Sequence, residues 1–464
     1  MVAATKRRAI ASADMAGPPL PPGPRTWGVL SNAISAARFA PGYLQRVAAR
    51  YGDIACIKAG PVRVYLLSSP ELAQDLLETN EARFEKGRAE QRVTRRLLGE
   101  GVLASEGEFH RRQHALIEPL LHGAALERFA PIVVERAVRM QEAWQDGQVV
   151  DLWDRLIRTM TEIMVEALFG VSVDAPAGAE LLQLLNGAVD AVERLPFAAL
   201  RIGERLPFPR NRRFEEVRAR LDAVLLGLVA ERRGDRRQRG DLLSSLARAR
   251  HPDGEPMPDR LVRDEALTLF RAAKTTGTAL SWTWHLLSRH PDPEARLLDE
   301  IDTVVGDELP SASDLARLTY CRRVLDEALR LFPPAWISGR RPVAEHEIGG
   351  YVIPVGSTVA TSPWVIHRDA RVHPAPERFD PDRFSPERRA GWHPFAYFPF
   401  GGGSRTCLGD EFAPLEALML LATVGRRWRL RPVPGHEVRP AAKAILRPRG
   451  GLPVVLQRRA QPVR

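Results

Sequence analysis

Cysteine is scarce in this sequence of 464 residues: only Cys56, Cys321 and Cys407 occur, and three residues cannot all pair with one another. Secreted proteins that depend on disulfides are much richer in cysteine, so we expect a reducing cytoplasm. Long apolar runs are also absent, and no stretch approaches the roughly 20 residues that a membrane helix needs. The basic start of the chain has no apolar core after it, which argues against a signal peptide. These absences predict a soluble, cytoplasmic protein.

Acidic residues are fewer than basic ones, 57 Asp and Glu against 67 Lys and Arg, which gives a formal net charge of +10. A basic chain can bind nucleic acid, but charge alone is weak support for such a partner. The densest basic run, residues 231–239, has no aromatic residues among its charges and is interpreted as a solvated loop. We therefore expect no nucleic-acid partner.

Glycine gathers at 401–403, shortly before Cys407 and an apolar helical segment over 412–421. Free N–H groups at the start of a helix, together with a nearby Arg, stabilise a thiolate. No second Cys or His lies at the spacing of a zinc site, which favours a cofactor that brings its own remaining ligands. Haem iron with an axial thiolate is such a cofactor. The alternative is a buried structural cysteine in a glycine-rich turn.

This stretch resembles the haem-binding signature of the cytochrome P-450 family, Phe-x-x-Gly-x-Arg-x-Cys-x-Gly. The matching residues are Phe400, Gly403, Arg405, Cys407 and Gly409. Four separated motifs occur in the order and register of that family, and the resemblance extends over roughly residues 40–458. It implies a mainly α fold with a small β region, in which a helical bundle with minor antiparallel sheets surrounds a haem. It further implies one catalytic domain over 18–464. Residues 1–17, before the proline-rich stretch, are expected to form a disordered tail.

The resemblance also assigns residues to the cofactor, which would be haem b with Cys407 as the axial ligand of its iron. The other residues that it assigns to the haem are Arg405, Arg340, His110, His114, Phe400, Gly401 and Gly409. The two arginines and the two histidines would contact the haem propionates. The family has an Arg where His114 stands, but a carboxylate can accept a hydrogen bond from either side chain.

A Glu-x-x-Arg element, Glu327 and Arg330, resembles the family's structural network beneath the haem. Residues three apart lie on one helix face and can pair. A further Arg is expected to join them, and its spacing to the Cys segment favours Arg383 over Arg378.

Periodicity and turn residues predict the order of the elements. We expect paired strands over 53–57 and 62–67 joined through Gly60-Pro61, helices over 70–79, 263–290, 293–305 and 320–331, a helical bundle over 125–229, and short strands at 340–342, 347–354, 358–361 and 453–456. The apolar break at 195–200 lies where the family has a mobile substrate lid.

The helix over 263–290 departs from the family at one point. The family has a small residue, then an acid and a Thr, in the positions that Arg271, Lys274 and Thr275 occupy here. We assign Thr275 and Lys274 to catalysis, and Arg271, Ala272, Trp336 and Ile337 to the substrate pocket. Three interpretations are open. The basic side chains extend away from the haem of an ordinary monooxygenase, or one of them binds a carboxylate, or oxygen activation is lost.

The resemblance implies insertion of oxygen into an apolar small molecule, a secondary metabolite such as a terpenoid or a polyketide. Electrons would come from a separate ferredoxin and its reductase, and the protein would be a monomer. The alternative function is peroxide-driven or redox-neutral chemistry on a substrate that bears a carboxylate, because Lys274 stands at the usual position of the acid.

Overall fold

The computed structural model describes residues 20–24, 29–59, 62–193, 209–235, 237, 239–251 and 253–460. The predicted tail at 1–17, the turn Gly60-Pro61 and the predicted lid at 195–200 lie outside these described residues. The chain divides into two compact units. Unit 1 comprises Met1–Gly87, Ile337–His373 and His393–Arg405, and unit 2 comprises Arg88–Trp336, Pro374–Trp392 and Thr406–Arg464. One catalytic domain over 18–464 remains a prediction.

Unit 1 contains a five-stranded sheet with the order β1-β2-β8-β5-β3. Its strands are β1 (Ile54–Ala59), β2 (Val62–Leu67), β8 (Thr358–Thr361), β5 (Ser338–Pro342) and β3 (Phe84–Glu85). The predicted pairing of β1 and β2 is confirmed, since the two strands are antiparallel with Cys56 opposite Tyr65. β2 and β8 run parallel, which requires a long connection instead of a hairpin.

The helix predicted over 70–79 is present in two parts, α3 (Pro70–Gln74) and the π-helix η2 (Asp75–Thr79). Ser69 begins α3, because its hydroxyl accepts a hydrogen bond from the N–H of Leu72 at 3.3 Å. Apolar side chains of this helix pack on the sheet and give unit 1 its own core. The other elements of unit 1 include α2 (Val29–Tyr51), α14 (Pro363–Ile366) and the antiparallel pair β6 (His346–Ile348) and β7 (Tyr351–Ile353).

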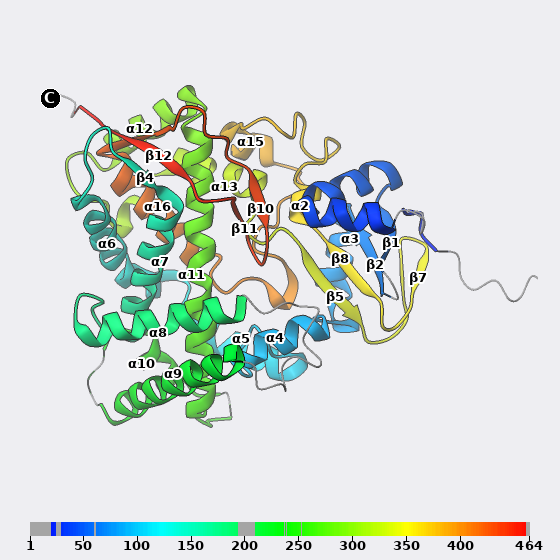
Figure 1. Ribbon diagram of the computed structural model, residues 1–464, viewed down its shortest axis with the longest axis horizontal. Helices are drawn as coiled ribbons and strands as arrows, with labels where there is room; N and C mark the ends of the chain where they lie inside the picture. The colour runs from blue at the N-terminus through cyan, green and yellow to red at the C-terminus, as the bar shows by residue number, and fades with distance from the viewer. Residues whose placement is uncertain are drawn as a thin grey trace, which may run out of the picture. The chain divides into compact units, whose positions relative to one another are not determined.

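Unit 2 is built around α11 (Asp259–Leu287), a helix of 29 residues. It begins at Asp259 instead of the predicted residue 263 and ends at Leu287, before the predicted residue 290. Figure 1 shows α11 running through this unit, with α7 (Leu152–Phe169), α13 (Thr319–Leu331) and α16 (Phe412–Gly425) packed beside it. Trp282 and Trp284 are buried in this packing.

The predicted helical bundle is confirmed by α6 (Ala130–Glu142), α7, α8 (Pro176–Glu193) and α9 (Pro209–Gly234). Gly170 ends α7 with a φ of +62°, which is the left-handed conformation that glycine adopts at helix C-termini. Unit 2 also contains α4 (Arg88–Leu98), α5 (Gly107–Ile117), α10 (Leu242–Arg248), α12 (Pro291–Val304), and sheets of β4 (Val149–Asp151), β12 (Pro453–Arg458) and β9 (Trp428–Pro432), and of β10 (Pro440–Ala442) and β11 (Leu446–Pro448).

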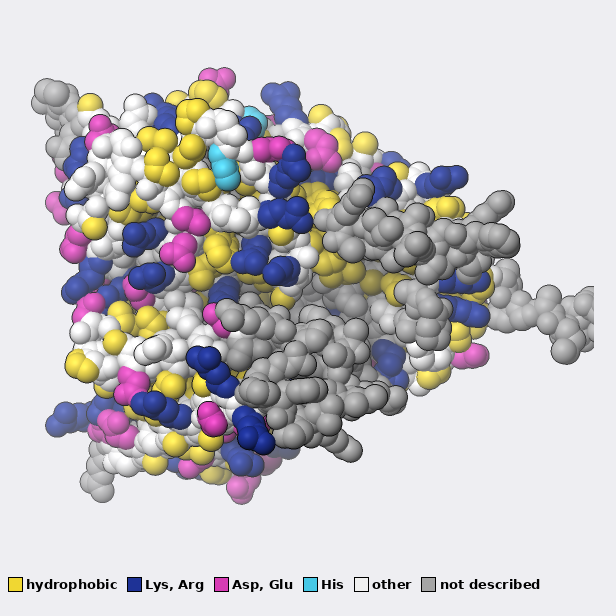
Figure 2. Space-filling view, viewed as in Figure 1, with side chains coloured by type: hydrophobic (Ala, Val, Ile, Leu, Met, Phe, Trp, Pro, Cys, Tyr) yellow, Lys and Arg dark blue, Asp and Glu magenta, His cyan; other side chains and the backbone are white. Residues whose placement is uncertain are grey.

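The basic run over 231–239 is only partly a loop, because α9 extends to Gly234. Arg232 in that helix is 1% exposed, donates to the carbonyl of Phe169 at 2.7 Å and lies 3.4 Å from the Asp241 carboxylate. The interpretation of the run as a solvated loop is therefore wrong at Arg232. Figure 2 shows Lys and Arg side chains interspersed with Asp and Glu over the face in view, without one continuous basic patch.

Candidate active site

Cys407 lies in the turn that follows the short 3₁₀ helix η10 (Gly403–Arg405) and precedes α16. The backbone N–H of Gly409 donates to the Cys407 sulfur at 3.4 Å. Because α16 begins only at Phe412, with Glu411 as its N-cap residue, the sulfur contacts the turn and not the first turn of the helix. The Cys407 side chain is exposed, yet the protein atoms around it desolvate the thiol and raise its pKa. A metal ion bound to the sulfur would favour the thiolate instead.

The surroundings of this sulfur fit a haem iron. Across the described ranges, no group of three or more His, Cys, Asp or Glu side chains could hold a metal ion, so a metal at Cys407 would need ligands that the protein does not supply. Gly409 also leaves the sulfur uncovered, since a Cβ at this position would lie 3.8 Å from the Cys407 Sγ. A single accessible thiol suits an iron whose equatorial ligands come from a porphyrin.

The glycines before Cys407 belong to unit 1, and Gly403 is required there by space as well as by conformation. Its φ is +68°, and a Cβ at this position would approach the carbonyl oxygen of Leu77 to 2.0 Å. The next residue, Ser404, donates its backbone N–H to the Glu81 carboxylate at 2.8 Å. Gly401 has a φ of +81° but more space, with the nearest atom 3.9 Å from such a Cβ. Phe400 is half-buried.

The two histidines assigned to the haem propionates lie on α5 in unit 2. His114 donates from Nε2 to the carbonyl oxygen of Thr406 at 3.2 Å, and its Nδ1 lies 3.7 Å from the Glu118 carboxylate. This contact places His114 against the residue that precedes Cys407. His110 is buried and donates from Nδ1 to the carbonyl oxygen of Val102 at 2.9 Å. Propionate binding by either histidine remains a prediction.

The two arginines assigned to the propionates lie in unit 1. Arg340 on β5 donates from one guanidinium nitrogen to the Ser338 hydroxyl and to the Gly339 carbonyl, both at 3.0 Å. Its neighbour Arg341 forms an ion pair with Glu85. Arg405 is half-buried at the end of η10. Arg341 is thus paired with a carboxylate, whereas Arg340 donates hydrogen bonds to residues of its own strand. Propionate binding by Arg340 and Arg405 remains a prediction.

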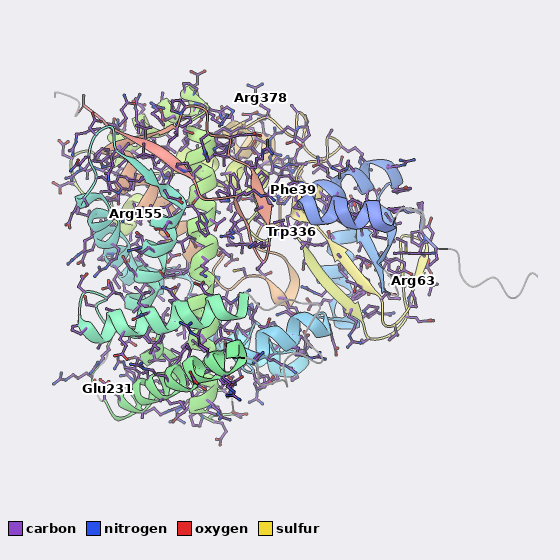
Figure 3. All side chains as sticks on the ribbon, in the orientation of Figure 1. Phe39, Arg63, Arg155, Glu231, Trp336 and Arg378 are labelled. Atoms are coloured by element: carbon purple, nitrogen blue, oxygen red, sulfur yellow. The ribbon has the colours of Figure 1, made fainter. Side chains whose placement is uncertain are left out.

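The three residues of the expected structural network are in contact and buried. Arg330 forms a bidentate pair with Glu327, with N···O distances of 2.6 and 2.8 Å. Arg383 lies 3.5 Å from the same carboxylate and donates to the carbonyl of Pro374 at 2.8 Å. Arg378 contributes only its carbonyl oxygen, at 3.2 Å from Arg330, while its exposed side chain lies at the periphery (Figure 3). The network fastens the segment 374–383 to α13.

The α11 residues that depart from the family are engaged in different ways. Lys274 forms an ion pair with Asp190 on α8, with an Nζ···Oδ1 distance of 2.9 Å. The side chain is 15% exposed, and the Asp190 carboxylate balances its charge; the assignment of Lys274 to catalysis remains a prediction. Thr275 donates its hydroxyl to the carbonyl of Ala272 at 2.7 Å. Arg271 is half-buried and Ala272 is exposed.

A cavity of about 1040 Å³ lies among α7, α8, α11 and the turn that joins β10 to β11. Its lining includes Trp153, Glu162, Asp190, Arg271, Lys274 and Lys443. Of the residues assigned to the substrate pocket, Arg271 lines this cavity. Trp336 donates from its indole N–H to the carbonyl of Lys443 at 3.0 Å and lies beside the same turn (Figure 3). Ile337 belongs to unit 1, where it is 37% exposed.

Sequence reasoning missed two side chains that contact the α11 segment. Asp190 lies 84 positions before its partner Lys274, and nothing in the local pattern indicated the pair. Glu416 on α16 is buried, accepts a hydrogen bond from the Thr276 hydroxyl at 3.2 Å and has its pKa raised to about 8 by desolvation. The signal for Glu416 was present, since it is the single charged residue of an otherwise apolar helix.

The fold and the single accessible thiol define a haem-thiolate protein, and the comparisons with known proteins agree. The sequence profile described as Cytochrome P-450 matches residues 21–454. Cyclooctatin synthase of Streptomyces melanosporofaciens is 36% identical over 399 residues, which are 85% of this chain and 87% of that protein. Pentalenene oxygenase of Streptomyces avermitilis is 34% identical over 400 residues, 85% of this chain and 88% of that protein.

Two further similarities extend this result. Cyclooctat-9-en-7-ol 5-monooxygenase of Streptomyces melanosporofaciens is 36% identical over 387 residues, 83% of this chain and 84% of that protein. The crystal structure of the cytochrome P-450DA heme domain has a TM-score of 0.85 at 25% identity and covers 96% of this chain and 99% of that chain. The chain belongs to the cytochrome P-450 family and is a monooxygenase of that family. The predicted fold is confirmed. Within the described residues, no helix is both long and apolar enough to cross a membrane.

Proposed function

We propose that this protein inserts one oxygen atom of O2 into a terpenoid. The observation that carries the proposal is the accessible sulfur of Cys407 in the turn before α16, in a chain whose family is established. Three relatives are named for cyclooctatin, cyclooctat-9-en-7-ol and pentalenene, and two of them are named as oxygenases. These names support a terpenoid over a polyketide, and oxygenation over the peroxide-driven or redox-neutral alternative.

The cofactor of this proposal is haem b, which supplies the activation of O2 and the insertion of oxygen when it is bound. Cys407 would hold its iron. The N–H of Gly409, 3.4 Å from the sulfur, would lower the electron-donating strength of the thiolate through its hydrogen bond. His114 would keep the backbone before Cys407 in place through its bond to Thr406. His110, Arg340 and Arg405 remain the candidates for the propionates.

The role of α11 is to orient water and to hold protons beside the substrate. The hydroxyl of Thr275 donates to Ala272 and keeps two lone pairs with which it can accept a hydrogen bond from water. Lys274 holds its proton on Nζ, where Asp190 accepts the hydrogen bond. The carboxylate of the pair is thus on α8 instead of α11, and Asp190 would accept the protons that the family's α11 acid accepts.

Electrons would reach the site from a separate ferredoxin and its reductase. The formal net charge of +10 favours an acidic carrier, because opposite charges accelerate encounter and orient the two surfaces. A monomer is expected.

The test of this function begins with the carbon-monoxide difference spectrum of the reduced holoprotein. The parent should give the red-shifted band of a thiolate-ligated haem, and Cys407→Ala should lose it. Turnover is then measured with cyclooctat-9-en-7-ol and pentalenene as probes, a ferredoxin pair and NADPH. Retention of the band in Cys407→Ala would end the haem-thiolate assignment. If peroxide supports turnover but no ferredoxin pair does, the proposal that a separate carrier supplies the electrons would fail.

A further inference from the structure

Arg271 on α11 lines the cavity of about 1040 Å³ and is half-buried there. Within the part of the chain that the structure describes, its guanidinium takes part in no hydrogen bond, ion pair or ring contact. Three residues later, Lys274 is held by Asp190 at 2.9 Å. Lys274 is thus paired, whereas Arg271 lines the cavity and has no protein acceptor for its hydrogen-bond donors among the described residues.

The other basic residues of this lining differ from Arg271. Arg158 on α7 is exposed and lies 3.9 Å from Asp154, and Arg447 on β11 covers the ring of Trp153 at 5.0 Å. Lys443 is exposed on the turn that joins β10 to β11. Arg447 is also half-buried, but its guanidinium lies over the Trp153 ring. Arg271 is thus the half-buried cation of the described lining that has neither a hydrogen bond nor a ring contact.

The acids of the same cavity decide which ligand suits Arg271. Asp154, Glu162, Asp174 and Asp190 all contribute to the lining. A ligand with a full negative charge would be opposed by these carboxylates, whereas a neutral oxygen would not. Glu162 on α7 is half-buried, and desolvation raises its pKa. A hydroxyl group accepts one hydrogen bond and donates another, so it suits a cavity that contains both an unpaired guanidinium and carboxyl groups.

The position of Arg271 on α11 determines where a bound substrate oxygen would lie relative to the carbon that is oxidised. Arg271 and Thr275 are four residues apart, so their side chains are neighbours on one face of α11, roughly 6 Å apart at Cβ. Of the two α11 residues that line the cavity, Lys274 directly precedes Thr275, which is not itself part of the lining. A substrate held by its oxygen at Arg271 could therefore extend along α11 toward Thr275, the residue assigned to catalysis. The oxygen that is already present and the carbon to be oxidised would lie in different parts of the skeleton.

We propose that Arg271 binds a hydroxyl oxygen that the substrate already carries, so that the enzyme acts on a terpenoid alcohol in preference to a terpenoid hydrocarbon. This rests on the proposed function and specifies its substrate class. A preceding reaction must then supply the alcohol, either a cyclisation that ends with capture of water or a first oxygenation. The enzyme would consume the alcohol with O2, two electrons from the carrier and two protons, giving a diol and water.

The experiment uses the holoprotein and three abietane diterpenoids that share one skeleton: abietadiene, abietadienol and abietic acid. Dissociation constants are measured from the change in haem absorption when each compound binds, and again by calorimetry. The parent should bind the alcohol about ten- to a hundred-fold more tightly than the hydrocarbon, the range for a hydrogen bond to a charged group. Arg271→Met should abolish that difference.

The matched control is Arg155→Met, which makes the same change on α7 at an exposed residue that does not line the cavity (Figure 3). It should retain the parent's preference. Each variant must keep the carbon-monoxide band of the parent, which shows that the haem environment is intact. Equal binding of alcohol and hydrocarbon by the parent would overturn this inference but not the proposed function. A preference for the alcohol that survives in Arg271→Met would do the same. Tightest binding of abietic acid would assign an anion site and overturn it too. If none of the three binds, the terpenoid substrate class itself fails.

Discussion

The hydroxyl of Thr276 on α11 donates to a carboxylate oxygen of Glu416 on α16 at 3.2 Å, and both residues are buried. Thr276 directly follows Thr275, and α16 is the helix that follows the Cys407 turn. This bond therefore joins the α11 segment assigned to catalysis to the helix next to the thiol. A carboxyl group in this position favours its neutral form, because burial raises the pKa of Glu416 to about 8.

Replacing Glu416 with Gln should stabilise the protein at alkaline pH. The pKa rises from 4.5 to about 8 on folding, so the folded protein binds the proton more tightly than the unfolded chain. The stability that the neutral group provides is complete below about pH 4.5 and is lost progressively as the pH rises to about 8. Gln keeps an acceptor for Thr276 and cannot ionise. We expect the free energy of unfolding of Glu416→Gln to exceed the parent's by several kcal/mol, at most about 5 kcal/mol, at pH 9 in urea titrations.

The free energies of unfolding of the parent and Glu416→Gln should agree near pH 4.5. The control is Glu142→Gln, at an exposed position on α6, whose free energy of unfolding should match the parent's at every pH. Some loss of stability should remain in Glu416→Gln, because Glu265 on α11 also has a pKa of about 8 and accepts the N–H of Val102. Equal stability of parent and Glu416→Gln at pH 9 would contradict the assignment of a neutral buried acid.

Gly403→Ala should damage the segment before Cys407 far more than Gly401→Ala. Both positions have positive φ, so each alanine introduces backbone strain of about 1 kcal/mol. Only at 403 would the new Cβ clash with the backbone, because it would lie 2.0 Å from the Leu77 oxygen, whereas at 401 the nearest atom is 3.9 Å away. We expect Gly403→Ala to lose at least about 2 kcal/mol of stability and to bind less haem per chain, measured by thermal unfolding and by the carbon-monoxide band. Similar behaviour of the two variants would show that steric contact at 403 does not matter.

Arg330→Met should strongly destabilise unit 2. Both Arg330 and Glu327 are fully buried, and removing the arginine would leave the glutamate without its bidentate partner. Breaking a buried pair by removal of one member costs about 3–5 kcal/mol. Arg378→Met is the control, since that side chain is exposed and only its carbonyl joins the network; we expect a change below about 0.5 kcal/mol. Equal thermal midpoints for the two variants would refute the importance of the network.

The parts of the site that could be predicted from sequence are those that depend on short spacings. Cys407 stands out by its glycines, and Glu327 pairs with Arg330 because residues three apart share a helix face. When two contacting residues lie far apart in the chain, the local sequence pattern contains no information about their contact. Asp190 on α8 meets Lys274 only through the packing of two helices, and Arg232 is buried against Asp241 and the carbonyl of Phe169, although its neighbours are charged. The parallel pairing of β2 with β8 is a long-range contact of the same kind.

The last prediction concerns the polarity of the Lys274–Asp190 pair. An ammonium group donates a proton but is poorly suited to accept one back from water near neutral pH, whereas a carboxylate can do both. The double variant Lys274→Asp with Asp190→Lys keeps the pair and moves the acid to α11, beside Thr275. We expect it to form more product per NADPH consumed than the parent, by about twofold or more, at similar substrate affinity.

The two single variants are the controls for this exchange. Each places two like charges together, and because Asp190 is 51% exposed the loss of stability should stay near 0.5–1 kcal/mol. Thr275→Ala in the double variant should remove the gain, since the relocated acid would act through that hydroxyl. If product per NADPH is the same in parent and double variant, the acid on α8 already serves the site as well as one on α11 would. The exchange of the acid and the base between α8 and α11 would then have no effect on product formed per NADPH.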